Sequence, residues 1–495
     1  MSSLKYGFDN DLYLKTQSEH IKERIKKFGG KLYLEFGGKL FDDYHASRVL
    51  PGFRPDSKIS MLMQLKDQAE AIVTINSNDI EKNKVRGDLG ITYDLEVMRL
   101  IDSFKERGIS VCAVVLTQYA DQRAAKVFER RMKEQGIPVY HHFAIEGYPA
   151  NIPLIVSDDG YGKDEFVKTT KPLVVVTAPG PGSGKMAVCL SQLYHENKNG
   201  VKAGYAKFET FPVWNLPLTH PVNIAYEAAT ADLNDRNMID PFHMDAYGKM
   251  AVNYNRDVDV FPVLNAMLQK IMGESPYKSP TDMGVNMAGN CIIDDEAVQA
   301  AAKEEIIRRY LNAQRARKQG VASDDIVTKL DVLMNQLGLK EEDRKVLKKV
   351  REMSQTINVP VAAMELPDGK IVTGKAGKLL GASPALILNA IKELAGIPDE
   401  IKLIAPEFIE PVQRMKESFG EKNCTLTIDD VLIALSIYAN KDANAAKALE
   451  KVKELRGCEV HLSIIPNGIN EATYRRLGVN MTCEPKYQTS CMYHI

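Results

Sequence analysis

Residues 173 to 190 read Leu-Val-Val-Val-Thr-Ala-Pro-Gly-Pro-Gly-Ser-Gly-Lys-Met-Ala-Val-Cys-Leu, and this stretch decides the fold class. An apolar run of strand length at 173–177 enters a glycine-rich turn, and a helical segment follows from Lys185 to about residue 196. A buried strand that leads directly into a helix is half of a β-α-β unit, the building block of parallel sheets. The stretch therefore predicts an α/β protein.

Strands and helices alternate on the N-terminal side of this stretch. Valine-rich or otherwise apolar runs predict strands, and periodic amphipathic runs that end at glycines predict helices between them. The predicted strands are 31–36, 69–75, 109–116, 139–145 and 154–157, and the predicted helices are 18–28, 94–107 and 121–134. This order predicts a mostly parallel, Rossmann-like sheet with a P-loop-like turn, within a domain of residues 1–222.

The pattern of predicted secondary structure changes after about residue 222. Residues 223–355 are mainly helical in pattern, with the clearest helices at 296–318, 324–338 and 341–354. The basic cluster between Arg308 and Lys318 is most simply a solvated helix face. Residues 356–495 then predict a smaller α/β unit, with a hairpin around residues 367–369, a helix opened by Ser383-Pro384, and strands at 400–404 and 460–465.

Composition excludes several classes of protein. The chain has 495 residues, 44% of them apolar, and a formal net charge of −1, so it lacks the basic excess of a nucleic-acid binder. No apolar run reaches the ~18 residues of a membrane span, and the first residues do not resemble a signal peptide. The seven cysteines are scattered without a Cys-x-x-Cys pair. These features indicate a cytoplasmic protein with free thiols and neither nucleic-acid nor membrane partners.

The glycine-rich turn has the chemistry of a phosphate site. Glycines allow backbone N–H groups to turn toward phosphate oxygens, the helix N-terminus adds partial positive charge, and a lysine adds a full one. The residues concerned are Gly180, Gly182, Ser183, Gly184 and Lys185. They predict a site for a phosphorylated small molecule, with ATP or another nucleotide as the candidate cofactor.

The turn departs from the usual G-x-x-x-x-G-K-[ST] pattern. Pro179 stands where the first glycine belongs, and Met186 replaces the hydroxyl residue that binds magnesium. No apolar run that ends in Asp follows the turn to supply a second magnesium ligand. A tight strand-to-helix turn without any ligand is therefore the competing interpretation, and the sequence leaves a divalent metal open.

Polar residues gather downstream of the turn, between 209 and 257. His220, Asp240 and His243 are the candidate catalytic residues, because imidazole and carboxylate groups there can run acid–base chemistry or hold a divalent metal. Loops after parallel strands collect at the ligand-binding edge of such sheets. The alternative is that these residues cap helices and turns.

Three segments carry a resemblance to a known family. They are 179–185, the run Thr-His-Pro-Val-Asn at 219–223, and the run Leu-Gly-Val-Asn-Met-Thr-Cys-Glu-Pro at 477–485. Together they resemble a bacterial family catalogued as a domain of unknown function, the 1846 family, over nearly the whole chain. The resemblance implies a bacterial cytoplasmic protein.

The first functional hypothesis is an enzyme that acts on a nucleotide or another phosphorylated small molecule. The second is a non-catalytic, nucleotide-responsive binding protein, which Met186 favours because it removes the usual magnesium ligand. The third is an oligomeric scaffold, since the long helices between 296 and 354 offer contacts for a homo-oligomer. A second glycine–lysine loop at Gly374–Gly381 is a candidate for another anion, or simply a connector.

Overall fold

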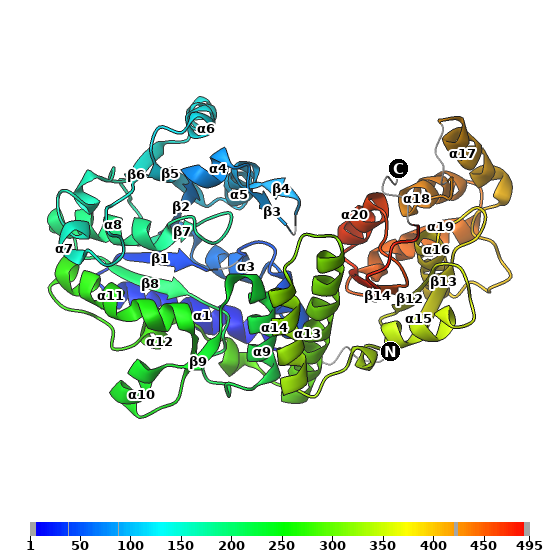
Figure 1. Ribbon diagram of the computed structural model, residues 1–495. Coiled ribbons are helices and arrows are strands. Elements are labelled where there is room, and N and C mark those ends of the chain that lie inside the picture. Colours follow the sequence, from blue (N-terminus) through cyan, green and yellow to red (C-terminus); the bar gives the residue numbers. More distant parts are fainter. Residues whose placement is uncertain (1–5, 38, 88, 420–423, 490–495) are drawn as a thin grey trace. The chain divides into compact units, whose positions relative to one another are not determined.

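The structure is a computed structural model that describes residues 6–37, 39–87, 89–419 and 424–489 (Figure 1). It forms two compact units, one of residues 6–302 and one that begins at Lys303. The first unit holds a seven-stranded parallel sheet, and the second holds a smaller sheet with helices. The predicted α/β class, with a helical middle segment and a smaller C-terminal α/β unit, is confirmed.

All seven strands of the first sheet are parallel. In sheet order they are β11 (Gly284–Val285), β8 (Gly204–Phe208), β1 (Leu32–Phe36), β7 (Leu173–Thr177), β2 (Ala69–Asn76), β5 (Ser110–Tyr119) and β6 (Val139–Phe143). Strands β1, β7 and β8 are buried along their whole length, as parallel strands covered on both faces require.

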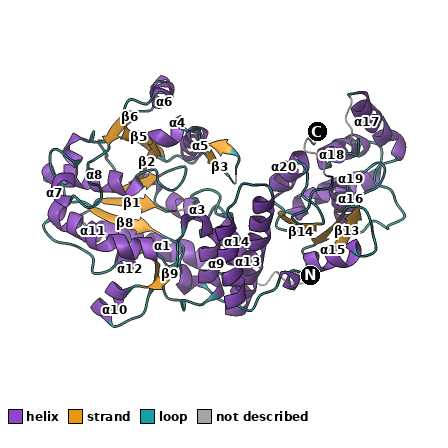
Figure 2. Ribbon diagram, viewed as in Figure 1, coloured by secondary structure: helices purple, strands orange, loops and turns teal. Residues whose placement is uncertain are grey.

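Helices flank these strands on both sides in Figure 2. The helices of the first unit are α1 (Asn10–Lys27), α2 (Tyr44–Val49), α3 (Ser57–Met63), α4 (Ser77–Glu81), α5 (Tyr93–Glu106), α6 (Arg123–Glu134), α7 (Ile152–Ile155), α8 (Lys185–Lys198), α9 (Pro221–Ala229), α10 (Pro241–Tyr247), α11 (Asn255–Met272) and α12 (Pro280–Met283). Two small hairpins, β3 (Val85–Arg86) with β4 (Ile91–Thr92) and β9 (Asn237–Ile239) with β10 (Val252–Tyr254), complete it.

The strand order reverses at the pair β1 and β7. From β1 the chain crosses over β7 to reach β2, β5 and β6, and from β7 it crosses over β1 in the opposite direction to reach β8. The connections that follow β1 and β7 therefore diverge, which leaves a crevice at the carboxyl ends of these two strands. In open α/β sheets, ligands bind at such a topological switch point.

Helix α13 (Asp295–Lys318) carries the chain from the first unit into the second. The second unit adds α14 (Asp324–Gln336), α15 (Lys345–Ser354), α16 (Ala382–Leu394), α17 (Pro406–Ser418), α18 (Ile428–Tyr438), α19 (Ala443–Glu450) and α20 (Gly468–Leu477). Its sheet has the order β13 (Ile371–Lys375), β12 (Val361–Glu365), β14 (Glu459–Leu462) and β15 (Asn480–Cys483). Strand β12 is antiparallel to both neighbours, whereas β14 and β15 are parallel.

Two predicted strands are wrong. Residues 154–157 overlap α7, because Asn151 and Pro153 begin a helical turn there. Residues 400–404 form no strand, although Leu403 and Ile404 are buried, because they lie in the short connection before Pro406 begins α17. Helix α16 also begins one residue before Ser383, with Gly381 as its N-cap.

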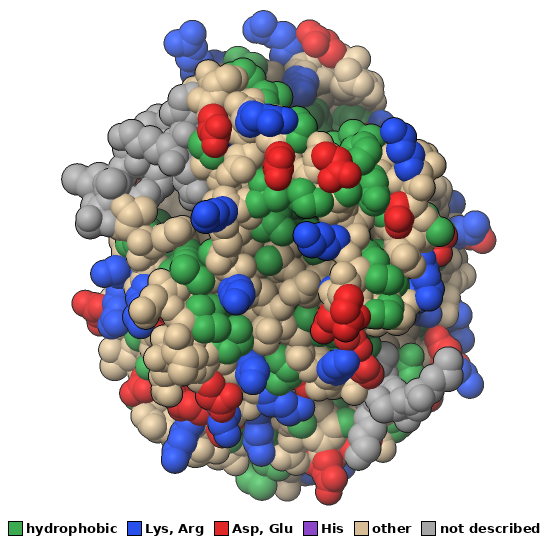
Figure 3. Space-filling model, turned by 90° about the vertical axis from the view of Figure 1, so that its right-hand side faces the viewer, with side chains coloured by type: hydrophobic (Ala, Val, Ile, Leu, Met, Phe, Trp, Pro, Cys, Tyr) green, Lys and Arg blue, Asp and Glu red, His purple; other side chains and the backbone are tan. Residues whose placement is uncertain are grey.

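The distribution of charged side chains can be followed on one face of the molecule. Acidic and basic side chains are interspersed over the part of the molecule described in Figure 3, and no patch of one sign dominates the face shown there. Within the described residues, no helix combines the length and the apolar character needed to cross a bilayer.

Candidate functional site

The turn between β7 and α8 is held in one shape by three hydrogen bonds. Ser183 Oγ donates to the Gly180 carbonyl at 3.0 Å, Thr117 Oγ1 to the Ser183 carbonyl at 3.0 Å, and Asn76 Nδ2 to the Gly182 carbonyl at 3.3 Å. All three bonds use carbonyl groups of the turn, and two of the donors come from the ends of β2 and β5. Three carbonyl groups of the turn are therefore satisfied within the protein.

Glycine is required within the turn by its backbone. Gly182 has φ 77° and Gly184 has φ 82°, a region that other L residues rarely adopt. A Cβ on Gly180 would lie 2.1 Å from the Tyr93 hydroxyl oxygen, and one on Gly184 would lie 2.8 Å from Thr117 Cγ2. The turn is thus packed against neighbours at two glycines, whereas the Cα of Gly182 faces open space.

The N–H groups of residues 182–187 donate to no acceptor in the described part of the chain. Those of Lys185, Met186 and Ala187 belong to the first turn of α8, where helices leave N–H groups unsatisfied. Helix α8 has 14 residues, so its N-terminus adds partial positive charge at the same place. This arrangement of donors fits an anion.

Lys185 opens α8 and lines a cavity. Its ammonium makes no ion pair or hydrogen bond with the described residues. Burial lowers the pKa of Lys185, a shift that nearby Glu35 opposes and Lys207 reinforces. A lysine without a partner at the rim of a cavity is disposed to pair with an anionic ligand.

The cavity encloses about 500 Å³ at the carboxyl ends of the strands. The turn and the start of α8 form one side, polar amides of β2 and β5 form a second, and an aromatic wall near the end of β6 forms a third. Its lining includes Glu35, Asn76, Asn78, Gln118, His142, Phe143, Tyr148, Tyr161, Asp164, Gly182, Gly184, Lys185, Met186 and Arg256. This volume and mixed lining suit a small organic ligand with an anionic group.

Glu35 is a residue that the sequence-based prediction missed. It lies on β1, the strand next to β7, opposite Val176, and it is 8% exposed. Tyr205 donates its hydroxyl hydrogen to Glu35 Oε2 at 2.7 Å. In P-loop proteins a carboxylate at the end of another strand of the sheet holds magnesium. The signal was an apolar run that ends in Glu at residues 32–35, before the turn rather than after it.

A buried charge cluster lies at the end of β8, beside Glu35. The Lys207 ammonium pairs with Asp257 and, at 3.0 Å, with Glu209 Oε1. Burial lowers the pKa of Lys207, but Asp257 and the other acidic neighbours outweigh it and raise the pKa well above its usual range. Burial also raises the pKa of Glu209 to about 8, although Lys207 lowers it. Lys207 is therefore neutralised by its own partners, whereas Lys185 has no such partner among the described residues.

The structure places His220 and Asp240 at helix-capping positions and His243 within α10. His220 Nδ1 accepts from the Val222 N–H at 3.2 Å at the start of α9, and its Nε2 lies 3.0 Å from Asp295 Oδ1. Asp240 caps α10 through the His243 N–H at 3.0 Å, and His243 Nδ1 lies 3.0 Å from Ser279 Oγ. None of the three lines the Lys185 cavity. Their acid–base role stays a prediction, and the cavity does not bring them together with the turn.

Asp240→Ala is expected to destabilise the protein by about 1–2 kcal/mol, because it removes the cap of α10. The Thr281 Oγ1 donor at 2.7 Å from Asp240 Oδ2 also loses its acceptor. Chemical denaturation measures the change, and Asp240→Asn, which keeps one acceptor oxygen, is the matched control with a smaller loss. A stable Asp240→Ala variant that had lost ligand binding or turnover would instead support the catalytic assignment.

Two further features of the sequence can be located in the structure. Gly374 lies on β13, and a Cβ there would approach the Leu386 nitrogen to 2.4 Å, so this glycine allows the strand to pack against α16. In the Gly374–Gly381 loop, the Gly377 N–H donates to the Leu380 carbonyl at 2.8 Å. Among the described residues, no three His, Cys, Asp or Glu side chains converge as a metal site.

The fold and this cavity define the protein as a parallel α/β protein with a ligand-sized crevice at its switch point. The family described as domain of unknown function DUF1846 matches the chain, its N-terminal part over residues 6–338 and its C-terminal part over residues 342–493. The chain belongs to this family.

Curated relatives align along the full chain. UPF0371 protein DIP2346 from Corynebacterium diphtheriae is 55% identical over 493 residues, which cover 98% of each chain. A UPF0371 protein from Streptococcus pneumoniae (strain JJA) is 52% identical over 490 residues, which cover 99% of each chain. The resemblance found in the sequence is thereby confirmed, and these relatives are bacterial.

Proposed function

We propose that the protein binds a phosphorylated small molecule in the Lys185 cavity, with the phosphate on the turn between β7 and α8. Two observations at the same cavity support the proposal. The N–H groups of residues 182–187 have no acceptor among the described residues, and Lys185 has no ion-pair or hydrogen-bond partner among them. Backbone donors and a helix N-terminus fix the oxygens of the phosphate, and Lys185 neutralises its charge.

A nucleotide suits this cavity better than inorganic phosphate alone. The wall near the end of β6 presents the rings of Phe143 and Tyr148, which offer flat apolar surface to a base. Asn76, Asn78 and Gln118 offer amide donors and acceptors for a sugar or base. ATP is therefore the first candidate ligand.

Glu35 favours an enzyme over a passive binding protein. A carboxylate beside a phosphate site can hold a magnesium ion or accept a proton from an attacking group. With Met186 at the position of the usual hydroxyl ligand, Glu35 is the residue through which a divalent metal would be held. The described cysteines are free, which suits the reducing bacterial cytoplasm where phosphorylated metabolites are found.

A thermal-shift screen of the full chain tests the proposal. Inorganic phosphate, sugar phosphates and nucleotides are compared with and without magnesium, in the wild type and in Lys185→Met. A ligand at ~100 times its dissociation constant should stabilise the protein by ~2.7 kcal/mol. We expect this stabilisation in the wild type and its loss in Lys185→Met.

The matched control is Lys202→Met, which removes an exposed lysine just beyond the end of α8. It should bind the same ligand as the wild type, because it lies at the opposite end of the helix from the turn. If no phosphorylated ligand stabilises the wild type, or if Lys185→Met and Lys202→Met respond alike, the turn is not a phosphate site.

A further inference from the structure

The lining of the Lys185 cavity contains a buried histidine and a buried aspartate in contact. His142 lies on β6 and is 4% exposed, and Asp164 follows the short helical turn Tyr161–Lys163 and is 5% exposed. Both line the same cavity as Lys185. Their contact could not be predicted from local sequence, because 22 positions separate the two residues along the chain.

The surroundings of His142 fix where its ring carries hydrogen. Its Nε2 lies 3.3 Å from the backbone carbonyl oxygen of Glu165. A carbonyl oxygen only accepts, so the Nε2 position must be protonated for this contact to be favourable. The other ring nitrogen, Nδ1, is buried, lies 3.3 Å from Asp164 Oδ2, and has no hydrogen-bond partner among the described residues.

The contact between Nδ1 and Asp164 needs a proton. An unprotonated Nδ1 and an ionised carboxylate are both acceptors, so they repel each other at this distance. The remaining Asp164 oxygen, Oδ1, already accepts from the Phe143 N–H at 3.0 Å, which orients the carboxyl group. A proton on Asp164 Oδ2 removes this repulsion, and burial disfavours the alternative of a charged imidazolium beside a charged carboxylate.

The pKa directions agree with this geometry. Burial lowers the pKa of His142 to about 3, and burial raises the pKa of Asp164 to about 6. Burial thus favours the neutral form of each group, which is the state with the proton on the carboxyl group. The other titratable groups nearby are His141 on the same strand, His195 on α8, the Glu165 side chain, and Tyr161; the positive forms of the two histidines oppose a charge on His142.

We propose that in mildly acidic solution Asp164, in contact with His142, holds one exchangeable proton in the wall of the Lys185 cavity, and exchanges it with a phosphorylated ligand bound there. The proton leaves Asp164 Oδ2 for a ligand oxygen, which leaves a carboxylate, and it returns by the reverse step. A phosphate group whose second pKa is ~6 has a proton affinity similar to that of the pair. The exchange with a ligand rests on the proposed function, whereas the protonation of the pair in the ligand-free protein does not depend on it.

The first experiment uses the ligand-free full chain. Nitrogen-15 spectra of histidine-labelled protein report whether Nδ1 of His142 carries hydrogen, and the His142 signal is assigned by its loss in His142→Gln. We expect an unprotonated Nδ1 from pH 5 to pH 8, with a shift of its resonance near pH 6 that disappears in Asp164→Asn. A protonated Nδ1 at neutral pH would overturn the assignment of the proton to Asp164.

The second experiment counts protons linked to binding. Titration calorimetry with ATP, and separately with inorganic phosphate, is repeated at pH 6 in two buffers that differ in ionisation enthalpy. The number of protons exchanged with the buffer should differ between the wild type and Asp164→Asn, while binding persists, because both share the contribution of the ligand phosphate and only the wild type adds that of the carboxyl group. Asp158→Asn, which changes an exposed aspartate nearby, should keep the wild-type exchange.

The two proposals fail in different ways. Absence of binding in the wild type overturns the proposed function and the exchange with ligand, but leaves the nitrogen-15 result as evidence on the pair. Binding with equal proton exchange in the wild type and Asp164→Asn overturns the role of the pair, and leaves the phosphate site intact.

Discussion

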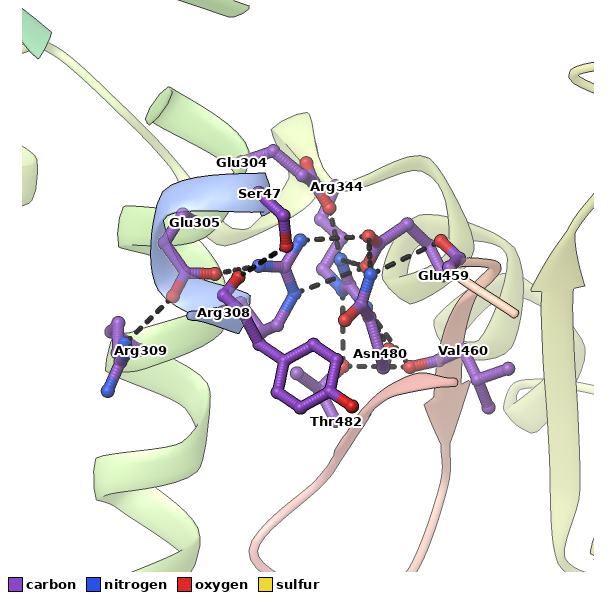
Figure 4. A network of polar contacts seen from close by, with 12 residues as sticks. Ser47, Glu304, Glu305, Arg308, Arg309, Arg344, Glu459, Val460, Asn480 and Thr482 are labelled. Carbon is purple, nitrogen blue, oxygen red and sulfur yellow. Dashed lines mark hydrogen bonds and ion pairs between the residues drawn. The ribbon is translucent and has the colours of Figure 1, made fainter. Parts of the chain in front are cut away.

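Arg344→Met is expected to destabilise the second unit by about 3–5 kcal/mol, the cost of leaving buried charges without their partner. The Arg344 side chain has no exposed surface and pairs with Glu304 and, at 2.7 Å, with Glu459 (Figure 4). It also donates to Thr482 Oγ1 at 3.1 Å and to the carbonyl oxygens of Val460 and Asn480 at 3.1 and 3.2 Å. The guanidinium therefore joins α13 and the start of α15 to β14 and β15.

Hydrogen exchange of the peptides that cover β14 and β15, in the full chain, measures this loss. The control is Arg351→Met on α15, whose side chain is 35% exposed and pairs with Glu341, Glu342 and Glu484. Pairs that are partly exposed contribute about 0–1 kcal/mol each. An Arg344→Met variant that opens no faster than Arg351→Met would show that the network adds little to stability.

Gly184→Ala is expected to abolish ligand stabilisation although Lys185 is unchanged. An alanine in the left-handed conformation costs about 1–2 kcal/mol. The new Cβ would also press on Thr117, which holds the Ser183 carbonyl, so the turn would be forced to shift and its N–H groups would lose their common direction. The thermal-shift screen that tests Lys185→Met measures this effect.

Gly200→Ala is a closely matched control for this variant. Gly200 follows the C-cap of the same helix and has φ 75°, and a Cβ added to it would meet no other atom within 4 Å. Gly200→Ala therefore has the same free-energy cost of an alanine in the left-handed conformation, but its new Cβ contacts no neighbouring residue. Without ligand, both variants should be destabilised by a similar amount, but only Gly184→Ala should lose the additional stabilisation by the ligand. Full ligand stabilisation in Gly184→Ala would count against the turn as the binding element.

Local sequence patterns predicted most of the first unit because they follow from short-range chemistry. The strand at 173–177 and the helix from Lys185 are adjacent along the chain. A buried parallel strand can be predicted from its own apolar run, without knowledge of its neighbours in the sheet. The pattern failed at 154–157 and 400–404, where apolar residues are buried in a helical turn or a connection. Buried positions are apolar in strands, helical turns and connections alike, so a short apolar run does not show which of these conformations it adopts.

The basic cluster on α13 shows the limit of reading charges locally. The prediction of a solvated helix face is wrong for Arg308, whose side chain is 8% exposed and pairs with Glu459 at 2.8 Å. That partner lies 151 positions further along the chain. A charge pattern within one helix cannot reveal a carboxylate supplied by a distant strand.

The sequence by itself determined the parallel α/β class, the family and the glycine-rich turn, because strand, turn and helix signals depend on neighbouring residues. The tertiary structure alone decided which side chains meet that turn. It brings Glu35, His142 and Asp164 to the Lys185 cavity from three separate segments, and it places His220 and Asp240 at helix caps instead. The order of strands in the sheet determines which side chains reach the same cavity, because the carboxyl ends of parallel strands lie at one edge of the sheet regardless of their separation along the chain.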